Sequence, residues 1–377
     1  MDVLGGFWTS VLAFLLVLTV LVFVHELGHY LVARRNGVRI EVFSIGFGPE
    51  LFGYTDRVGT RWKISALPLG GYVKMFGDAD PASTPGAHLT AMTEEERAVS
   101  FHHKPLGQRA AVVAAGPIAN FIFSITVLSV LFATAGQSFT PADVGGVQPG
   151  SAAERAGLKP GDLIRAIDGT EIQRFEEIRS IVSIKPGESL RMDVERDGKM
   201  IALDATPDAR DIVDRMGNSH RVGQLGITRG GADMKRHDPA TAVWQAAREI
   251  YGMISGTFTA LGQMIEGSRG TEELGGPLRI AQMSGEVAQS GWYPLVWFMA
   301  FLSVNLGLIN LFPVPMLDGG HLLFYAIEGA LGRPLGARAQ EYGFRIGLAL
   351  VLTLMVFATW NDLVQLRVVD FFRGLVS

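Results

Sequence analysis

The stretch FWTSVLAFLLVLTVLVFVHELGH, residues 7–29, decides how this chain folds. Phe7 to Val24 carries no charge and is long enough for a transmembrane helix, which takes about 20 residues. Ionisable side chains at the end of such a run are costly in lipid and therefore indicate a function. On a helix, His25 and His29 lie on one face and can share a metal ion, while Glu26 can act on a nearby water. The pattern predicts a zinc hydrolase site in a bilayer; the alternative is a histidine pair that only bonds to neighbouring helices.

Composition favours a polytopic membrane protein that carries a soluble module. Hydrophobic residues make up 48% of the 377 residues and charged residues only 19%. Three further uncharged stretches predict spans: Ala110–Gly136, Val287–Leu317, and Ile346–Asn361 continuing to Val364. A fifth apolar stretch, Ile250–Ile265, contains several glycines, and its bulky residues follow a helical stripe, which predicts a helix lying on the membrane surface.

Basic residues predict the orientation of the chain in the membrane. No Lys or Arg precedes the first span, whereas Arg34, Arg35 and Arg39 follow it and Lys104 and Arg109 precede the second. By the positive-inside rule this loop is cytoplasmic, so the polar region between spans two and three lies outside. Arg367 and Arg373 at the C-terminus fit this scheme less well. The net charge of −4 gives no support for nucleic-acid binding, and the absence of cysteine excludes disulfides and thiolate metal ligands.

A third metal ligand is needed, because zinc hydrolases usually keep three protein ligands and one open position. The segment Asn310–Gly320 contains Pro313 and Pro315, which end a helix, and Asp318, which we predict lies at the depth of the two histidines. His321 is the competing ligand, and a plain turn leaving the membrane is the alternative. If Ile250–Ile265 crossed the bilayer, Asp318 would lie roughly 20–30 Å from His25, too far for zinc bonds of about 2 Å.

Three motifs together resemble the site-2 proteases, specifically the bacterial RseP-type intramembrane metalloproteases. They are His25-Glu-Leu-Gly-His29, Gly116-Pro-Ile-Ala-Asn120-Phe121, and Asn310 to Leu317-Asp318-Gly319, and the likeness runs nearly end to end. The resemblance implies a zinc endopeptidase with His25, His29 and Asp318 as ligands and Glu26 as general base. It also implies that Asn120, Asn305 and Asn310 hold the unwound substrate, although asparagine in a membrane helix often only bonds to a neighbouring helix.

The region 139–230 resembles a single PDZ domain. Short apolar strands are predicted at Leu163–Ile167, Leu190–Val194 and Met200–Leu203, a helix at Phe175–Val182, and the domain closes near Leu225-Gly226-Ile227. PDZ domains bind extended peptides by adding a strand to a sheet edge. A domain that only excludes bulky substrates is the alternative.

The cytoplasmic stretch is predicted to form strands at Val42–Phe47 and Arg61–Ala66, followed by Gly70-Gly71-Tyr72-Val73. In the family such residues form a β-hairpin that dips towards the active site and offers an edge to the substrate. A solvated cytoplasmic sheet is the alternative. The acidic insert from Asp78 to Val99 is predicted to be a surface loop.

The resulting expectation is a polytopic α-helical membrane protein of the bacterial inner membrane. It has four transmembrane helices, an extracytoplasmic α+β PDZ-like domain and a cytoplasmic-side membrane-associated β-hairpin. The predicted segments are helix one (1–36), the cytoplasmic loop (37–105), helix two (106–136), the PDZ domain (139–230), the surface helix (239–267), helix three (287–318) and helix four (343–367). The resemblance implies cleavage of single-span membrane proteins, such as anti-sigma factors or signal-peptide remnants, after a first extracytoplasmic cut. A metal transporter and a catalytically silent PDZ scaffold remain alternatives.

Overall fold

The computed structural model describes residues 3–78, 92–213, 219–231, 233–267, 270 and 275–365. In this part of the chain, four helices are long and apolar enough to span a membrane: Trp8–Arg35, Leu106–Thr134, Trp292–Asn310 and Arg338–Val364. They belong to α1 (Val3–Arg35), α3 (Leu106–Thr134), α8 (Trp292–Asn310) and α10 (Ala337–Gln365). The predicted four-helix membrane fold with a β-rich insert is confirmed. The chain forms two compact units: a mainly helical one that contains most of these helices, and a β-rich one that contains all the described strands after β2 (Arg61–Met75) and comprises residues 130–242 and 257–271.

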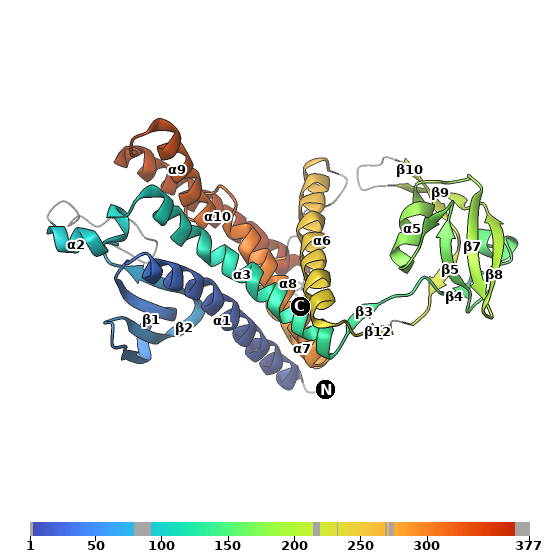
Figure 1. The fold of residues 1–377 in the computed structure, drawn as a ribbon, viewed down its shortest axis with the longest axis horizontal. Helices are drawn as coiled ribbons and strands as arrows, with labels where there is room; N and C mark the ends of the chain where they lie inside the picture. The colour runs from blue at the N-terminus through green and yellow to red at the C-terminus, as the bar shows by residue number, and fades with distance from the viewer. Residues whose placement is uncertain are drawn as a thin grey trace, which may run out of the picture. The chain divides into compact units, whose positions relative to one another are not determined.

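Helices α1 and α3 approach closely because small residues lie between them (Figure 1). A Cβ added to Gly28 of α1 would lie only 2.7 Å from the Cβ of Ala119 in α3. Helix α8 packs on α3 through hydroxyl groups: Ser303 Oγ donates to the carbonyl oxygen of Asn120 at 3.1 Å, and Ser124 Oγ donates to that of Ala300 at 3.0 Å. Small residues and interhelical hydrogen bonds are the usual means by which membrane helices pack.

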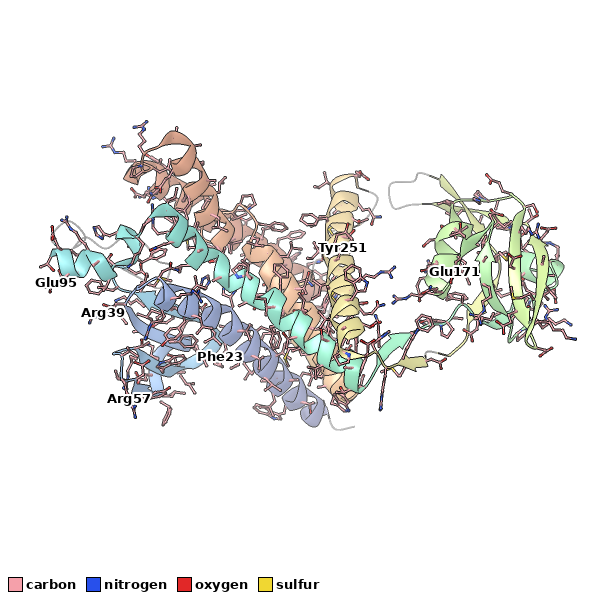
Figure 2. All side chains as sticks on the ribbon, viewed as in Figure 1. Phe23, Arg39, Arg57, Glu95, Glu171 and Tyr251 are labelled. Carbon is pink, nitrogen blue, oxygen red and sulfur yellow. The ribbon has the colours of Figure 1, made fainter. Side chains whose placement is uncertain are left out.

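Strands β1 (Ile40–Thr55) and β2 (Arg61–Met75) form the predicted β-hairpin and contact α1 (Figure 1). Both strands are longer than predicted, because Glu50–Thr55 also pairs with Arg61–Ser65. The base of the hairpin is fixed by aromatic packing, since the ring of Phe43 on β1 lies 5.7 Å from that of Phe23 on α1. Figure 2 labels Phe23 on this helix. The far end exposes large apolar side chains, namely Leu51, Phe52, Tyr54 and Val58. Such a surface favours contact with lipid.

The acidic insert is helical at its end, where a loop was predicted. Helix α2 (Glu94–Val99) begins at a capping box in which Thr93 Oγ1 accepts from the Glu96 backbone and the Glu96 carboxylate accepts from the Thr93 N–H. The short helix η2 (Phe101–His103) follows. The rest of the predicted loop, residues 79–91, lies outside the described residues.

The third span begins later than predicted, at Trp292 rather than Val287. Gly291 has φ 117°, a conformation that ends the preceding helix α7 (Pro277–Gln289) before α8 starts. The buried carboxylate of Asp362 in α10 accepts hydrogen bonds from the backbone N–H groups of Gly276, Leu278 and Arg279, and so caps α7. After α8 ends at Asn310, helix α9 (Asp318–Leu331) follows. Helix α6 (Pro239–Ile265) exposes Trp244, Tyr251, Phe258 and Ile265 and is not among the four candidate spans of the described residues.

The β-rich unit contains a four-stranded antiparallel sheet in the order β6-β5-β7-β8. Its strands are β5 (Leu163–Ile167), β6 (Thr170–Glu171), β7 (Leu190–Arg196) and β8 (Lys199–Ala205). Helix α5 (Phe175–Ser183) adds Ile178 and Val182 to a core shared with Ile164, Leu190, Met192 and Val194. Asp197 and Gly198 both have positive φ, the conformation that a tight turn between β7 and β8 requires.

The remaining elements of this unit are one short helix and six strands that pair in twos. They are β3 (Gln137–Phe139), β4 (Val144–Val147), α4 (Ala152–Arg155), β9 (Asp208–Val213), β10 (Ser219–Gln224), β11 (Ile227–Arg229) and β12 (Asp233–Lys235). Strand β11 pairs with β4, β12 with β3, and β10 with β9. Strand β11 begins directly after Leu225 and Gly226 and pairs with β4.

Candidate active site

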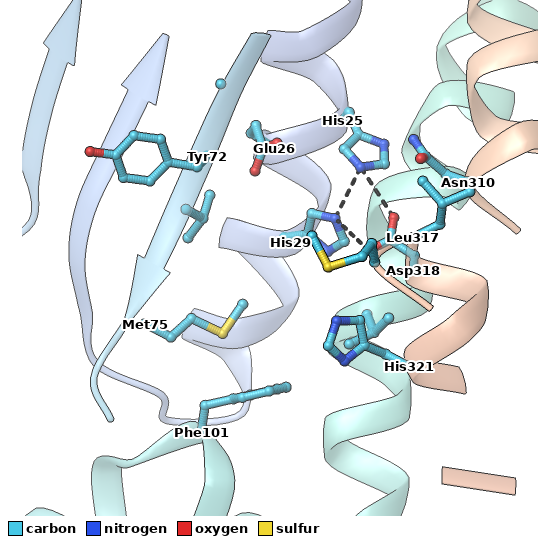
Figure 3. Close-up of a pocket in the computed structure, with 14 residues that line it drawn as sticks. His25, Glu26, His29, Tyr72, Met75, Phe101, Asn310, Leu317, Asp318 and His321 are labelled. Atoms are coloured by element: carbon cyan, nitrogen blue, oxygen red, sulfur yellow. Dashed lines mark hydrogen bonds and ion pairs between the residues drawn. The ribbon is translucent and has the colours of Figure 1, made fainter. Parts of the chain in front are cut away.

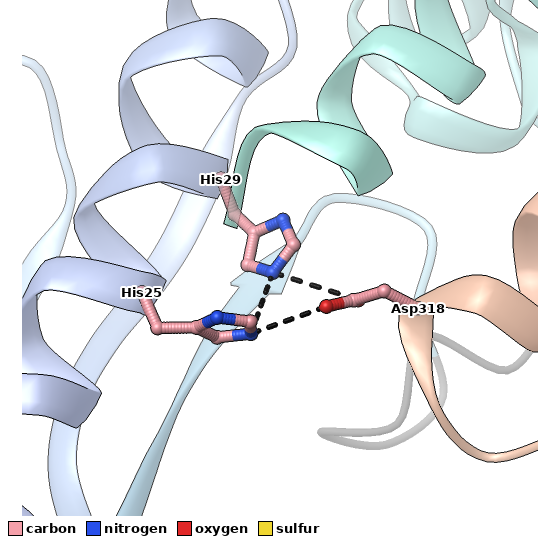
Figure 4. A group of neighbouring side chains, drawn as sticks. All are labelled: His25, His29 and Asp318. Carbon is pink, nitrogen blue, oxygen red and sulfur yellow. Dashed lines mark hydrogen bonds and ion pairs between the residues drawn. The ribbon is translucent and has the colours of Figure 1, made fainter. Parts of the chain in front are cut away.

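Two imidazoles on α1 and one carboxylate on α9 face one another (Figure 4). His25 Nε2 lies 3.2 Å from His29 Nε2 and 3.2 Å from Asp318 Oδ2, and His29 Nε2 lies 3.6 Å from Asp318 Oδ1. The two histidines are 9% and 8% exposed. The spacing of four residues on α1 places both rings on one face, as the sequence predicts.

A tightly folded connection brings Asp318 to the histidines. Met316 has φ 86°, which is rare for a residue with a side chain, and Asp318 is the first residue of α9. Glycine is required at the next two positions: a Cβ on Gly320 would lie 2.5 Å from Pro315 Cα, and one on Gly319 would meet the backbone of Leu311. The connection therefore depends on close backbone contacts that larger residues would prevent.

The Nδ1 atoms of both imidazoles contact groups on α3. His29 Nδ1 lies 2.9 Å from the carbonyl oxygen of Val112, so this nitrogen carries the proton and Nε2 is left as an acceptor. His25 Nδ1 lies 3.1 Å from the side-chain nitrogen of Asn120, which is fully buried. Asn120 Oδ1 has no hydrogen-bond partner among the described residues. Exchanging the amide oxygen and nitrogen lets Oδ1 accept from His25 Nδ1–H and satisfies both groups.

The donor set fits a divalent metal ion. One ligand atom from each of His25, His29 and Asp318 lies within 4.8 Å of the others, and these residues form the metal-type cluster found among the described residues. Asp318 Oδ2 is buried and has no hydrogen-bond partner in the described part of the chain, despite its short distance to His25 Nε2. Buried oxygen and nitrogen acceptors that face one another without protons are the arrangement that zinc requires.

Gly116 on α3 makes room for the two imidazoles. A Cβ at this position would lie 2.6 Å from His29 Cε1 and 2.8 Å from His25 Cε1. Contacts this short do not occur in folded proteins, so α3 can approach the histidines only with glycine here. Gly116 belongs to the motif on which the family resemblance rests, but no role could be assigned to it without the crossing of α1 and α3.

Glu26 lines a cavity of about 190 Å³ together with His25, His29 and Asp318 (Figure 3). The hairpin packs against this side chain, since a Cβ added to Gly71 in β2 would lie 3.4 Å from Glu26 Cγ. Gly71 permits this contact, since a Cβ there would lie 2.7 Å from Val22 Cγ1. The other lining residues are Gly71, Tyr72, Val73, Met75, Phe101, Val113, Asn310, Met316, Leu317 and His321.

The predicted substrate-contacting residues do not all lie at this cavity. Asn310, Gly71, Tyr72 and Val73 line it, whereas Gly70 and Asn305 are not among the lining residues. Asn305 Nδ2 donates to the carbonyl oxygen of Phe301, and Asn120 lies behind His25. Sequence reasoning did not single out Val112, Phe101 or Met75, because a main-chain acceptor and ordinary apolar side chains carry no recognisable signal.

Comparisons with known proteins agree with this geometry. The sequence model of peptidase family M50 matches residues 13–354. A predicted zinc metalloprotease of Agrobacterium fabrum is 50% identical over 96% of this chain and 97% of its own length. Protease RseP of Yersinia pestis is 33% identical over 95% of this chain and 99% of its own length. The crystal structure of the PDZ domain of an SdrC-like protein from Listeria monocytogenes is 23% identical, with 25% of this chain and 90% of that one covered and a TM-score of 0.19.

Proposed function

The chain belongs to peptidase family M50, and from this premise we propose that this membrane zinc metalloprotease cleaves transmembrane segments of single-span membrane proteins. Anti-sigma factors and signal-peptide remnants, already clipped outside the membrane, are the substrates we propose. The observation that carries the proposal is the convergence of His25, His29, Asp318 and Glu26 on one cavity beside membrane helices. A metal transporter or a silent scaffold would not need a carboxylate fixed beside this cluster.

We assign the metal to His25 Nε2, His29 Nε2 and Asp318. When bound there, zinc supplies Lewis acidity, which polarises a carbonyl group and makes a water molecule more acidic. Val112 and Asn120 orient the two imidazoles by contacting the Nδ1 atoms of the rings. Both Nε2 atoms are then free for the metal.

Glu26 acts as the general base and then as the general acid. Its carboxylate takes a proton from the attacking water while the new C–O bond forms at the substrate carbonyl. It then gives this proton to the peptide nitrogen as the C–N bond breaks, which releases a carboxylate and an amine. Strand β2, which packs against Glu26 at Gly71, keeps the carboxylate at the cavity during both transfers.

Strand β2 presents the substrate in an extended form. A transmembrane helix protects its peptide bonds by internal hydrogen bonds, so the segment must unwind before a carbonyl can be attacked. Gly71, Tyr72 and Val73 bring a strand edge to the cavity wall, where an unwound segment can pair with it. Substrates with helix-breaking residues near the cut are therefore favoured, and Asn310 is available to bind a freed peptide group.

The distribution of basic residues supports an orientation with the cavity towards the cytoplasm and the PDZ-like unit in the periplasm. The exposed apolar side chains of α6 support a helix on the outer membrane surface. We propose that the PDZ-like unit either captures a substrate tail or excludes substrates with large outer domains.

Replacing Glu26 tests the proposal directly. Glu26→Gln keeps the shape of the side chain but cannot accept a proton, so cleavage should fall at least about a hundredfold while zinc and fold are retained. The assay uses the full-length protein co-reconstituted with a tagged single-span membrane protein whose outer domain has been removed. The matched control is Glu41→Gln on β1, whose carboxylate pairs with Lys74 at 2.9 Å and does not line the cavity. Cleavage by Glu26→Gln within about tenfold of the wild type would refute the assignment.

A further inference from the structure

His321 lines the catalytic cavity, but the proposed mechanism gives it no role. It occupies the first turn of α9, three residues after Asp318, so the two side chains project from the same side of the helix. It lines the same cavity as Glu26. In the view of Figure 3, His321 and Glu26 lie on different sides of His29 and Asp318. A peptide bond positioned at the metal-type cluster would therefore have Glu26 on one side and His321 on the other.

The imidazole of His321 has no hydrogen-bond partner among the described residues, in contrast to those of His25 and His29. It is also outside the group of residues whose ligand atoms converge. Its ring is held by packing instead: the ring of Phe344 on α10 lies 5.4 Å away, and Phe324 contacts Phe344 edge-on at 5.6 Å. A polar ring that is fixed by aromatic contacts, faces a cavity and lacks a protein partner is available to a ligand.

We propose that His321 contacts the substrate and donates a hydrogen bond to the oxygen of the peptide carbonyl that is cut. A neutral imidazole carries one N–H donor, which suits a carbonyl acceptor. Negative charge gathers on this oxygen as water adds to the carbon, so the hydrogen bond strengthens in the transition state. His321 keeps its proton throughout, and the proton transfers remain with Glu26. This inference rests on the proposed function and adds a catalytic residue to it.

Two substitutions separate hydrogen bonding from packing. His321→Phe keeps an aromatic ring against Phe344 but removes the donor, whereas His321→Gln keeps an N–H donor and loses the ring. If the donor acts in the transition state, kcat of His321→Phe should fall about 100- to 1,000-fold with KM within about threefold. His321→Gln should recover to within about tenfold of the wild type. His103→Phe is the matched control, because His103 bonds to Ser100 Oγ at 3.1 Å and does not line the cavity.

The experiment measures zinc content and cleavage kinetics of the full-length variants with the clipped single-span probe protein. Retained zinc, a lower kcat and recovery in the Gln variant support the inference. A wild-type kcat in His321→Phe would overturn it, and so would loss of zinc from a folded variant, since the residue would then be a ligand. Glu26→Gln is measured in parallel. An inactive Glu26→Gln beside a fully active His321→Phe refutes this inference alone, whereas an active Glu26→Gln refutes the proposed function.

Discussion

Two carboxylates, Asp162 in the β-rich unit and Asp318 in the helical unit, differ in how their buried oxygens are paired. In the β-rich unit, Asp162 is 1% exposed, yet both of its oxygens are paired: Arg196 binds them at 2.7 Å each, and the Lys159 backbone N–H adds a bond at 2.8 Å. In the helical unit, Asp318 keeps a buried oxygen without a hydrogen-bond partner among the described residues. A fully satisfied buried charge stabilises a fold, whereas an unsatisfied one marks a place for a ligand.

Glycine shows the same contrast. Gly116 and Gly28 in the membrane helices are pressed against neighbouring atoms, while Gly161 and Gly169 in the β-rich unit have open space around them and positive φ angles. The first pair permits close approach of helices, and the second permits turns. Substitutions at Gly28 and Gly116 should therefore fail through steric overlap, and those at Gly161 and Gly169 through backbone strain.

The largest effect is expected for Gly116→Ala. The added methyl group would occupy space taken by both imidazoles, so zinc binding and cleavage should fall about a hundredfold or more. Gly107→Ala is the control, because it lies on the same helix with no atom within 4 Å of the added Cβ. Metal analysis and cleavage assays check the pair. A zinc-loaded Gly116→Ala protein with near-normal cleavage would show that the close approach of α3 does not matter.

A smaller effect is expected for Asn120→Ala. Removing a group that orients a metal-binding histidine typically costs 10- to 100-fold in metal affinity or activity. Zinc titration should show such a loss, whereas Thr126→Ala, on an exposed part of the same helix, should bind zinc normally. If Asn120 instead held only the substrate, zinc affinity would stay unchanged and KM alone would rise.

Asp162→Asn should lower the stability of the β-rich unit without changing zinc binding or cleavage. The substitution removes a charged group that accepts two hydrogen bonds from Arg196, and it should destabilise the β-rich unit by about 2–3 kcal/mol. Hydrogen exchange in the full-length protein measures this, while zinc content and cleavage of the clipped probe should remain normal. Asp193→Asn is the control, since its contact with Arg191 is 4.0 Å long and exposed, and such pairs contribute about 1 kcal/mol or less.

The smallest expected effect is the pH dependence of this unit. Burial raises the pKa of Asp162, but the hydrogen bonds from Arg196 and the Lys159 backbone outweigh it and lower the pKa below the ordinary 3.8. A lowered pKa in the folded state means that the stabilisation is complete above the ordinary value and is lost as the pH falls through the lower one. Hydrogen exchange at decreasing pH should show acid destabilisation that Asp162→Asn reduces. If acid destabilised the variant as much as the wild type, the acid sensitivity would have to come from other carboxylates.

The sequence predicted those parts of the molecule that depend on local pattern. The His25–His29 spacing, the span that carries it and the strand Leu163–Ile167 follow from periodicity and turn residues. The start of α8 was misplaced, because residues 287–291 carry no charge, like the span itself, and only the conformation of Gly291 separates the helices. The position of Asn120 behind His25 and the space at Gly116 depend on how α3 crosses α1, which no local pattern encodes.

X-ray absorption at the zinc edge of the full-length wild-type protein and of His321→Ala tests the central claim most directly. The site predicts two imidazoles and at least one oxygen ligand at about 2.0–2.2 Å, with the same spectrum in the variant. Three imidazoles in the wild type, with one lost in His321→Ala, would contradict the assignment of His25, His29 and Asp318 as the metal site.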